Sequence, residues 1–144
     1  MIVAVSGWRD WTDTRFVFTH LYRYIHTYGT PDTRLYVRVG CARGVDRFVR
    51  GYAAAHPGSI DLTVYRADWD TYGKAAGPMR NSNMLQGDHE QAADPFQGVH
   101  ADRLLAFPQP GINWDVDKSG TVSCIREAVR LGIDWEVPEY SGSE

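Results

Sequence analysis

The chain has 144 residues, 43% hydrophobic and 23% charged, which is enough for one domain with a buried core and argues against disorder. No apolar run approaches the ~20 residues of a transmembrane helix, and the apolar N-terminal segment lacks the basic start of a signal peptide, so we expect neither a membrane span nor export. The net charge of -3 has the wrong sign for a surface that binds nucleic acid, and two cysteines without disulfide or metal-ligand spacing are typical of a cytoplasmic protein.

The first half of the chain predicts three strands separated by two helices. Residues 2–6 form the short apolar run of a strand buried on both faces, and residues 13–28 repeat apolar side chains at helical spacing. Residues 35–39 predict the second strand, and a second amphipathic helix runs from Val45 to about residue 55. Residues 60–66 alternate apolar and polar side chains, as a third strand does.

The second half continues the alternation of helices and strands. Pro78 is expected at the first position of a helix that runs to about residue 85, and the polar stretch 86–100 predicts a loop or lid. Residues 102–107 predict the fourth strand. Ser119 begins the last helix, which ends before Gly132, and residues 133–137 predict a final strand.

This order of elements predicts one fold class. Strands that alternate with helices pair in parallel through right-handed crossovers, so we expect a single Rossmann-like, doubly wound α/β domain with a mainly parallel sheet of about five strands. We assign residues 1–139 to this domain and residues 140–144 to a frayed C-terminal tail. Such sheets bind ligands beyond the carboxyl ends of their strands, so the residues that follow the strands are candidates for a site.

The first candidate segment follows the first strand and reads Gly7-Trp8-Arg9-Asp10. Gly7 lets the backbone approach a ligand, Trp8 offers a flat face for a base, and Arg9 has the geometry to bind phosphate. A tight turn explains the same residues, with Trp8 in the core and Arg9 paired to Asp10. Both interpretations stay open.

The second candidate segment follows the second strand and consists of Gly40, Cys41, Ala42, Arg43 and Gly44. Its free backbone N–H groups and the dipole of the following helix predict an anion site, although the pattern is neither the dinucleotide fingerprint nor a Walker A loop. Asp46 either caps that helix or accepts a hydrogen bond from a ribose hydroxyl, and both roles stay open.

The third candidate segment leads into the helix expected at Pro78. Its candidate binding residues are Lys74, Gly77, Pro78, Arg80, Asn81 and Met84. Arg80 and Asn81 are expected in the first helical turn, where a cation is unfavourable unless an anion lies nearby. This local conflict indicates a site, because sequences break local rules mostly where function requires it. An Arg80 that simply reaches solvent is the alternative.

The fourth candidate segment begins the last helix. Gly120 and Thr121 present N–H and hydroxyl donors at a helix N-terminus, where phosphate binds well. Capping of the same helix by Ser119 is compatible with that role.

Together these segments resemble the SLOG superfamily, the Rossmann-like group that includes the "lonely guy" phosphoribohydrolases and DNA-processing protein A. The chain is most similar to the YspA/YpsA-related branch, whose members are frequent in bacteria and phages. The resemblance spans Val3 to about Val137 and is most specific over residues 73–81 with Met84. It implies a site for a nucleotide or nucleotide derivative and a homodimer or larger assembly.

One departure from the family pattern bears on catalysis. In the phosphoribohydrolases the last motif is Pro-Gly-Gly-x-Gly-Thr-x-x-Glu, and its glutamate is catalytic; the matching position here is Cys124. A neutral thiol cannot replace a carboxylate that stabilises an oxocarbenium-like centre. We therefore expect a binding protein that senses or sequesters its ligand, with no further cofactor and no metal.

Two alternatives to binding stay open. The first is hydrolysis of an N-glycosidic or phosphoanhydride bond in a nucleotide, for which Asp10, Asp46 or Asp68 would have to supply the missing carboxylate. The second, less favoured by the net charge, is binding of single-stranded nucleic acid.

Overall fold

The computed structural model describes residues 1–30, 33–88 and 92–141. Over these residues it has one parallel sheet, in the order β3-β2-β1-β4-β5. Its strands are β1 (Ile2–Gly7), β2 (Leu35–Gly40), β3 (Ile60–Tyr65), β4 (Arg103–Phe107) and β5 (Asp134–Glu136). Its helices are α1 (Thr14–Tyr28), α2 (Val45–Ala55), α3 (Trp69–Tyr72), α4 (Ala76–Gln86) and α5 (Gly120–Leu131), with a 3-10 helix, η1 (Gly73–Ala75).

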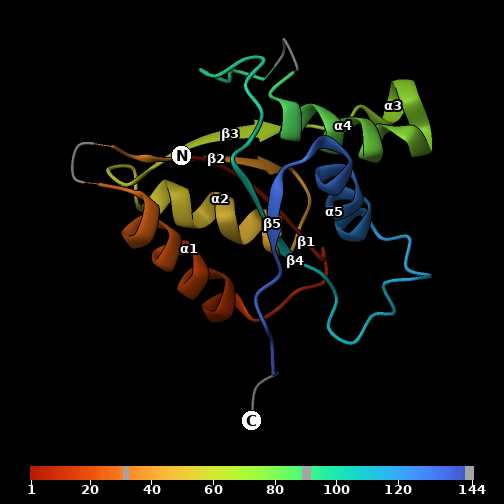
Figure 1. Cartoon of the computed structure of the whole chain (residues 1–144), viewed down its shortest axis with the longest axis horizontal. Coiled ribbons are helices and arrows are strands. Elements are labelled where there is room, and N and C mark those ends of the chain that lie inside the picture. The colour runs from red at the N-terminus through yellow and green to blue at the C-terminus, as the bar shows by residue number, and fades with distance from the viewer. Residues whose placement is uncertain (31–32, 89–91, 142–144) are drawn as a thin grey trace.

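The helices cover both faces of this sheet, with α1 and α2 on one side and α4 and α5 on the other (Figure 1). The central strand β1 shows why both faces are apolar. Val3 and Val5 belong to the core beneath α1 and α2, whereas Ile2 and Ala4 belong to the core beneath α4 and α5. The predicted Rossmann-like, doubly wound α/β class is confirmed.

The strand order reverses between β1 and β4. From β1 the chain moves outward to β2 and β3, then returns to the other side of β1 with β4. The backbone N–H of Trp8 donates to the carbonyl oxygen of Phe107 at 2.9 Å, which joins the two strand ends at this switch point. Ligands of such sheets bind in the crevice at this position.

The region before α4 differs from the sequence-based expectation. The short α3 and η1 were not predicted, and α4 begins at Ala76, so the placement of Pro78 at the first helical position is wrong. Helical structure begins before the predicted helix because Asp68 caps α3: its side chain accepts from the backbone N–H of Thr71 at 3.1 Å. Arg80 consequently lies in the second turn of α4. Pro78 is still tolerated, since N–H groups of a first turn have no partner within the helix.

The predicted loop 86–100 has no helix or strand in its described part after α4, and residues 89–91 lie outside the described residues. Arg38 of β2 binds the later part of this loop. The guanidinium of Arg38 donates to Asp94 Oδ2 at 2.7 Å and to the Phe96 carbonyl at 3.0 Å. Both Arg38 and Asp94 side chains are 2% exposed, so this ion pair is buried.

The final residues of the described chain lie against α1. The Tyr140 hydroxyl donates to Asp13 Oδ2 at 2.9 Å, and its ring contacts Trp11 and Phe16. Residues 142–144 of the predicted tail lie outside the described residues. Within the described ranges, every helix is too short or too polar to pass through a lipid bilayer.

Candidate functional site

Charged side chains from α2 and α4 meet at the end of β2. A side-chain carbon placed on Gly40 would collide with Nη1 of Arg80 and would lie 2.6 Å from Oδ2 of Asp46. Glycine is therefore required at this position so that both side chains can reach the strand end. The second and third predicted segments are thus brought together in space, as expected.

Asp46 is 4% exposed, and its Oδ2 accepts from the backbone N–H of Ala42 at 3.2 Å. Burial raises the pKa of this carboxyl, while the Arg80 guanidinium, the Ala42 N–H and Arg50 oppose the rise. Asp46 does not cap α2, because the N-cap is Gly44 and makes no side-chain hydrogen bond. Its carboxylate instead holds the backbone of the preceding loop.

Arg50 fixes the same loop from the next turn of α2. Its Nη1 donates to the carbonyl oxygens of Gly40 and Ala42, both at 3.0 Å. With two carbonyls and one N–H of the loop bound by side chains of α2, the loop between β2 and α2 is well fixed before any ligand arrives.

The loop after β1 packs directly on the loop after β2. A side-chain carbon on Gly7 would overlap the Val45 side chain, and one on Gly44 would lie 2.6 Å from the Trp8 carbonyl oxygen. Gly44 also has a φ of 71°, which other residues rarely adopt. Packing between the two loops is therefore sufficient to explain these two glycines.

The charges of the loop after β1 are arranged differently from the tight-turn alternative. Asp10 pairs with Arg43, Nη2 to Oδ1 at 2.7 Å, rather than with Arg9. Arg9 is exposed and makes no ion pair with any residue that the structure describes. Trp8 is half-buried, with its ring edge-on to Trp11 at 6.5 Å between centroids.

The third and fourth predicted segments are linked by Asn81. This side chain is 3% exposed, and its Nδ2 donates to the Gly120 carbonyl at 3.1 Å, while Nε of Arg80 donates to its Oδ1 at 3.1 Å. The start of α5 is capped by Ser119, whose Oγ accepts from the Val122 N–H at 3.3 Å, as predicted. Gly120 itself is exposed, and among the described residues no heavy atom beyond its chain neighbours and its own helix backbone lies within 4 Å of the position a side-chain carbon would take. Asn81 thus orients Arg80 and joins it to the start of α5.

Cys124 lies beneath this group and is 0% exposed. Burial raises the pKa of its thiol to about 12, although Arg80 and a hydrogen bond with the Ser6 side chain act in the opposite direction. The thiol is therefore neutral at physiological pH, as the sequence comparison with the phosphoribohydrolase motif assumed.

The remaining predicted residues are spread over different environments. Met84 is 1% exposed in the core beneath α4, and Thr121 is also buried at 4%. Lys74 and Pro78 are exposed, and Gly77 packs under the Trp69 ring, which would lie 3.1 Å from an added side-chain carbon. These positions do not converge on Gly40 as Arg80 and Asp46 do.

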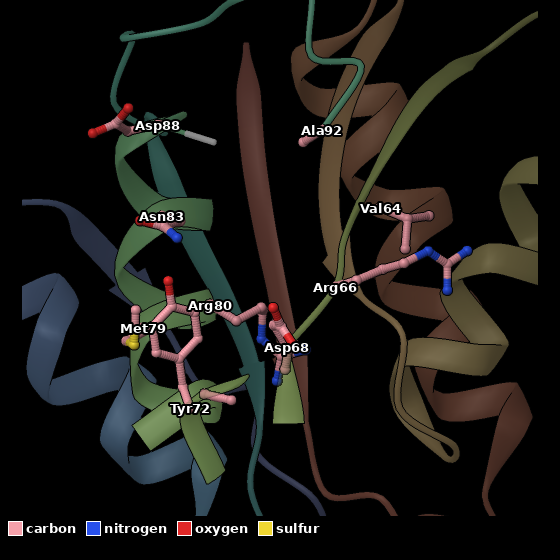
Figure 2. Close-up of a pocket in the computed structure, with 11 residues that line it drawn as sticks. Val64, Arg66, Asp68, Tyr72, Met79, Arg80, Asn83, Asp88 and Ala92 are labelled. Atoms are coloured by element: carbon pink, nitrogen blue, oxygen red, sulfur yellow. The ribbon is translucent and has the colours of Figure 1, made fainter. Parts of the chain in front are cut away.

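A cavity of about 740 Å³ adjoins this group, between the end of β3 and helices α3 and α4. Its size lies in the range of small-molecule sites. Its polar and large lining residues include Arg66, Asp68, Tyr72, Met79, Arg80 and Asn83. Figure 2 shows Arg80 reaching from α4 to the same end of the cavity as Tyr72 and Met79. Of the predicted binding residues, Arg80 lines this cavity. The α3 helix, which contributes Tyr72 to the lining, was not predicted, because a four-residue helix leaves no periodic pattern.

Metal ligands are not gathered in the part of the chain that the structure describes. No three His, Cys, Asp or Glu residues there are placed to hold an ion. What the site offers is a cation, Arg80, beside a fixed loop and an open helix start.

An open parallel sheet with this strand order and a glycine-rich carboxyl edge defines a Rossmann-like α/β protein. The chain belongs to the YspA, cpYpsA-related SLOG family, whose pattern matches residues 1–72, and the predicted family is thereby confirmed. The chain is also 33% identical over 137 residues to the Gene 61 protein of Mycobacterium phage D29, a match that covers 91% of this chain and 90% of that protein. No solved structure matches the chain significantly.

Proposed function

We propose that the protein binds a nucleotide or nucleotide derivative at the carboxyl edge of its sheet, with the phosphate against Arg80 and the loop from Gly40 to Gly44. The observation that carries this proposal is the placement of Arg80. The Arg80 guanidinium occupies the space that a side chain on Gly40 would fill. No carboxylate of the described residues forms an ion pair with Arg80. A guanidinium that is positioned by Asn81 beside a fixed loop, with no carboxylate at ion-pair distance, suits a phosphate ligand.

Two further features support an anion at this place. The exposed start of α5 at Gly120 presents backbone N–H groups, and Asn81 ties it to Arg80. Family membership points in the same direction, toward a nucleotide-related ligand. Binding that serves sensing or sequestration needs no catalytic group, and the neutral thiol of Cys124 offers none.

Hydrolysis of a nucleotide bond is a second candidate function, which one observation favours. Asp46 is a buried carboxyl beside Arg80 whose pKa is raised by burial, a feature common among acid–base catalysts. Of the other two carboxylates considered, Asp10 is exposed and paired with Arg43, and Asp68 accepts from the Thr71 N–H at the start of α3. Asp46 is therefore the group through which catalysis is to be tested.

Titration calorimetry with the four ribonucleoside 5′-monophosphates tests the binding proposal. Arg80→Ala should weaken binding by about tenfold or more, since a charge-assisted hydrogen bond to phosphate is lost. The matched control is Arg15→Ala, which removes an exposed arginine from α1. Equal affinities of wild type and the Arg80 variant, with both proteins folded, would refute the assignment.

Chromatography of the same mixtures separates binding from catalysis. The binding proposal expects no free base and no cleaved phosphate after long incubation with wild type. Product that disappears in the Asp46→Asn variant would instead establish the hydrolytic candidate.

A further inference from the structure

The cavity beside α3 and α4 continues the proposed phosphate site. Arg80 is the residue shared by both: its guanidinium lies at Gly40, and its side chain lines the cavity. A ligand whose phosphate contacts Arg80 therefore has its remaining atoms directed either into this cavity or into solvent. With about 740 Å³, the cavity has room for a nucleoside.

Two large side chains line this cavity without being buried in the protein. Tyr72 is 51% exposed and Met79 is 39% exposed, and Figure 2 shows them at the end of the cavity that Arg80 reaches. An exposed aromatic ring and a polarisable thioether form a surface on which a flat heterocycle stacks well. Trp69 of the same helix, α3, lies over Gly77 and is 57% exposed.

The polar lining of the cavity includes hydrogen-bond acceptors as well as the cation of Arg80. Asp68 accepts from the Thr71 N–H with Oδ1, and its other oxygen has no partner among the described residues. A carboxylate repels phosphate but accepts hydrogen bonds from hydroxyl and amino groups, as found on ribose and bases. Asn83 adds both a donor and an acceptor to the same lining. Arg80 therefore offers a contact for the anion and Asp68 an acceptor for a hydroxyl or amino donor, and Figure 2 shows both at the same end of the cavity.

We propose that this cavity holds the base and ribose of a nucleoside monophosphate whose phosphate lies against Arg80, with the base stacked on Tyr72 and Met79. This inference rests on the proposed function and adds the place and the residues that bind the nucleobase, a contact that a sugar phosphate lacks. The nucleobase is recognised through residues on α3 and α4, away from the glycine-rich loops.

Calorimetry that compares ribose 5-phosphate with AMP, GMP, CMP and UMP tests this inference. At least one nucleotide should bind wild type about tenfold more tightly than ribose 5-phosphate, since stacking of a base on an aromatic ring is worth that much. Tyr72→Ala should abolish this advantage and leave the affinity for ribose 5-phosphate unchanged, whereas Tyr72→Phe, which keeps the ring, should retain it. Tyr22→Ala is the matched control, because Tyr22 is an equally exposed tyrosine (58%) on α1, across the sheet.

The outcomes separate this inference from the proposed function. Ribose 5-phosphate that binds as tightly as every nucleotide, or a Tyr72→Ala variant that keeps the full advantage, would overturn the base site and leave the phosphate site intact. Nucleotide binding that depends on Tyr72 but not on Arg80 would support the base site and overturn the placement of the phosphate. Absence of binding for all five compounds would overturn both.

Discussion

The guanidinium of Arg80 and the carboxylate of Asp46 approach the α-carbon of Gly40 from two different helices. Arg80 comes from α4 and Asp46 from α2, so the end of β2 is the place where the two halves of the chain meet. Any change at Gly40 therefore acts on both charged groups at once.

Gly40→Ala should displace Arg80 and weaken nucleotide binding by about tenfold or more, because a charge-assisted contact with phosphate is lost. The added carbon also overlaps Asp46, which is held by Ala42, so we expect a destabilisation of about 1–3 kcal/mol from overpacking. Calorimetry gives the first quantity and urea unfolding the second.

Gly51→Ala is the control for this substitution. Gly51 lies in α2 with open space where a side-chain carbon would go, so alanine should stabilise the protein by up to about 1 kcal/mol and leave binding unchanged. If the Gly40→Ala protein bound nucleotide as tightly as the Gly51→Ala protein, nucleotide binding would not depend on the present position of Arg80.

The fold could be predicted from the sequence because β1 is apolar on both faces. The unbroken run from Ile2 to Val5 indicates a parallel strand between two helical layers, and the structure places its alternate residues in two separate cores. The carboxyl ends of such strands share one edge, so the segments that follow β1 and β2 could be predicted to lie together, as the contacts between Gly44 and Trp8 show.

The parts of the site that sequence did not reveal depend on tertiary contacts. The sequence shows where a glycine is, but it does not show which residue fills the space beside that glycine. At Gly7 this space is filled by Val45, and at Gly40 it is filled by Arg80. The α3 helix is too short for a periodic signal, so the cavity that it lines with Tyr72 was not foreseen.

Asp94→Ala should destabilise the protein by about 3–5 kcal/mol, because it leaves the guanidinium of Arg38 buried without its partner. The Tyr65 hydroxyl, which donates to Asp94 Oδ2 at 2.5 Å, loses its acceptor as well. Asp10→Ala provides the contrast: its ion pair with Arg43 is more than half exposed on both sides, and its loss should change the free energy of unfolding little. Similar effects of the two substitutions in urea unfolding would contradict the importance of burial here.

Asp46→Asn should become more stable relative to wild type as the pH rises. Burial raises the pKa of Asp46 in the folded protein above its value in the unfolded chain, so the protonated form is favoured by folding. The stability contributed by this carboxyl is fully present below the unfolded pKa and is lost as the pH rises through the folded pKa. Asparagine stays neutral and avoids this loss, which urea unfolding between about pH 4 and pH 8 would detect.

Asp117→Asn is expected to behave in the opposite way and serves as the comparison. Hydrogen bonds from the Ser119 side chain and backbone N–H lower the pKa of Asp117, so its contribution is present above the unfolded pKa and is lost as the pH falls through the folded pKa. Equal pH profiles for the two variants would contradict the sign assigned to Asp46.

The two cysteines should differ sharply in reactivity toward an aromatic disulfide that releases a coloured nitrothiobenzoate when a thiolate attacks it. Only the thiolate reacts, and the reagent must reach it. Cys124 is 0% exposed with its pKa raised to about 12, whereas Cys41 is half-buried in the loop that follows Gly40. Native protein should therefore release one equivalent of the coloured product, and unfolded protein two.

Two variants and one ligand complete this last experiment. Cys41→Ser should remove the reaction of the native protein, and Cys124→Ser should leave it unchanged, which assigns the reactive thiol by residue. A saturating nucleotide that binds at the loop from Gly40 to Gly44 should slow the reaction of Cys41, since the ligand would cover the loop. Rapid modification of Cys124 in folded protein would mean that the layer between Ser6 and α5 opens readily, and it would contradict a neutral, enclosed thiol beneath Arg80.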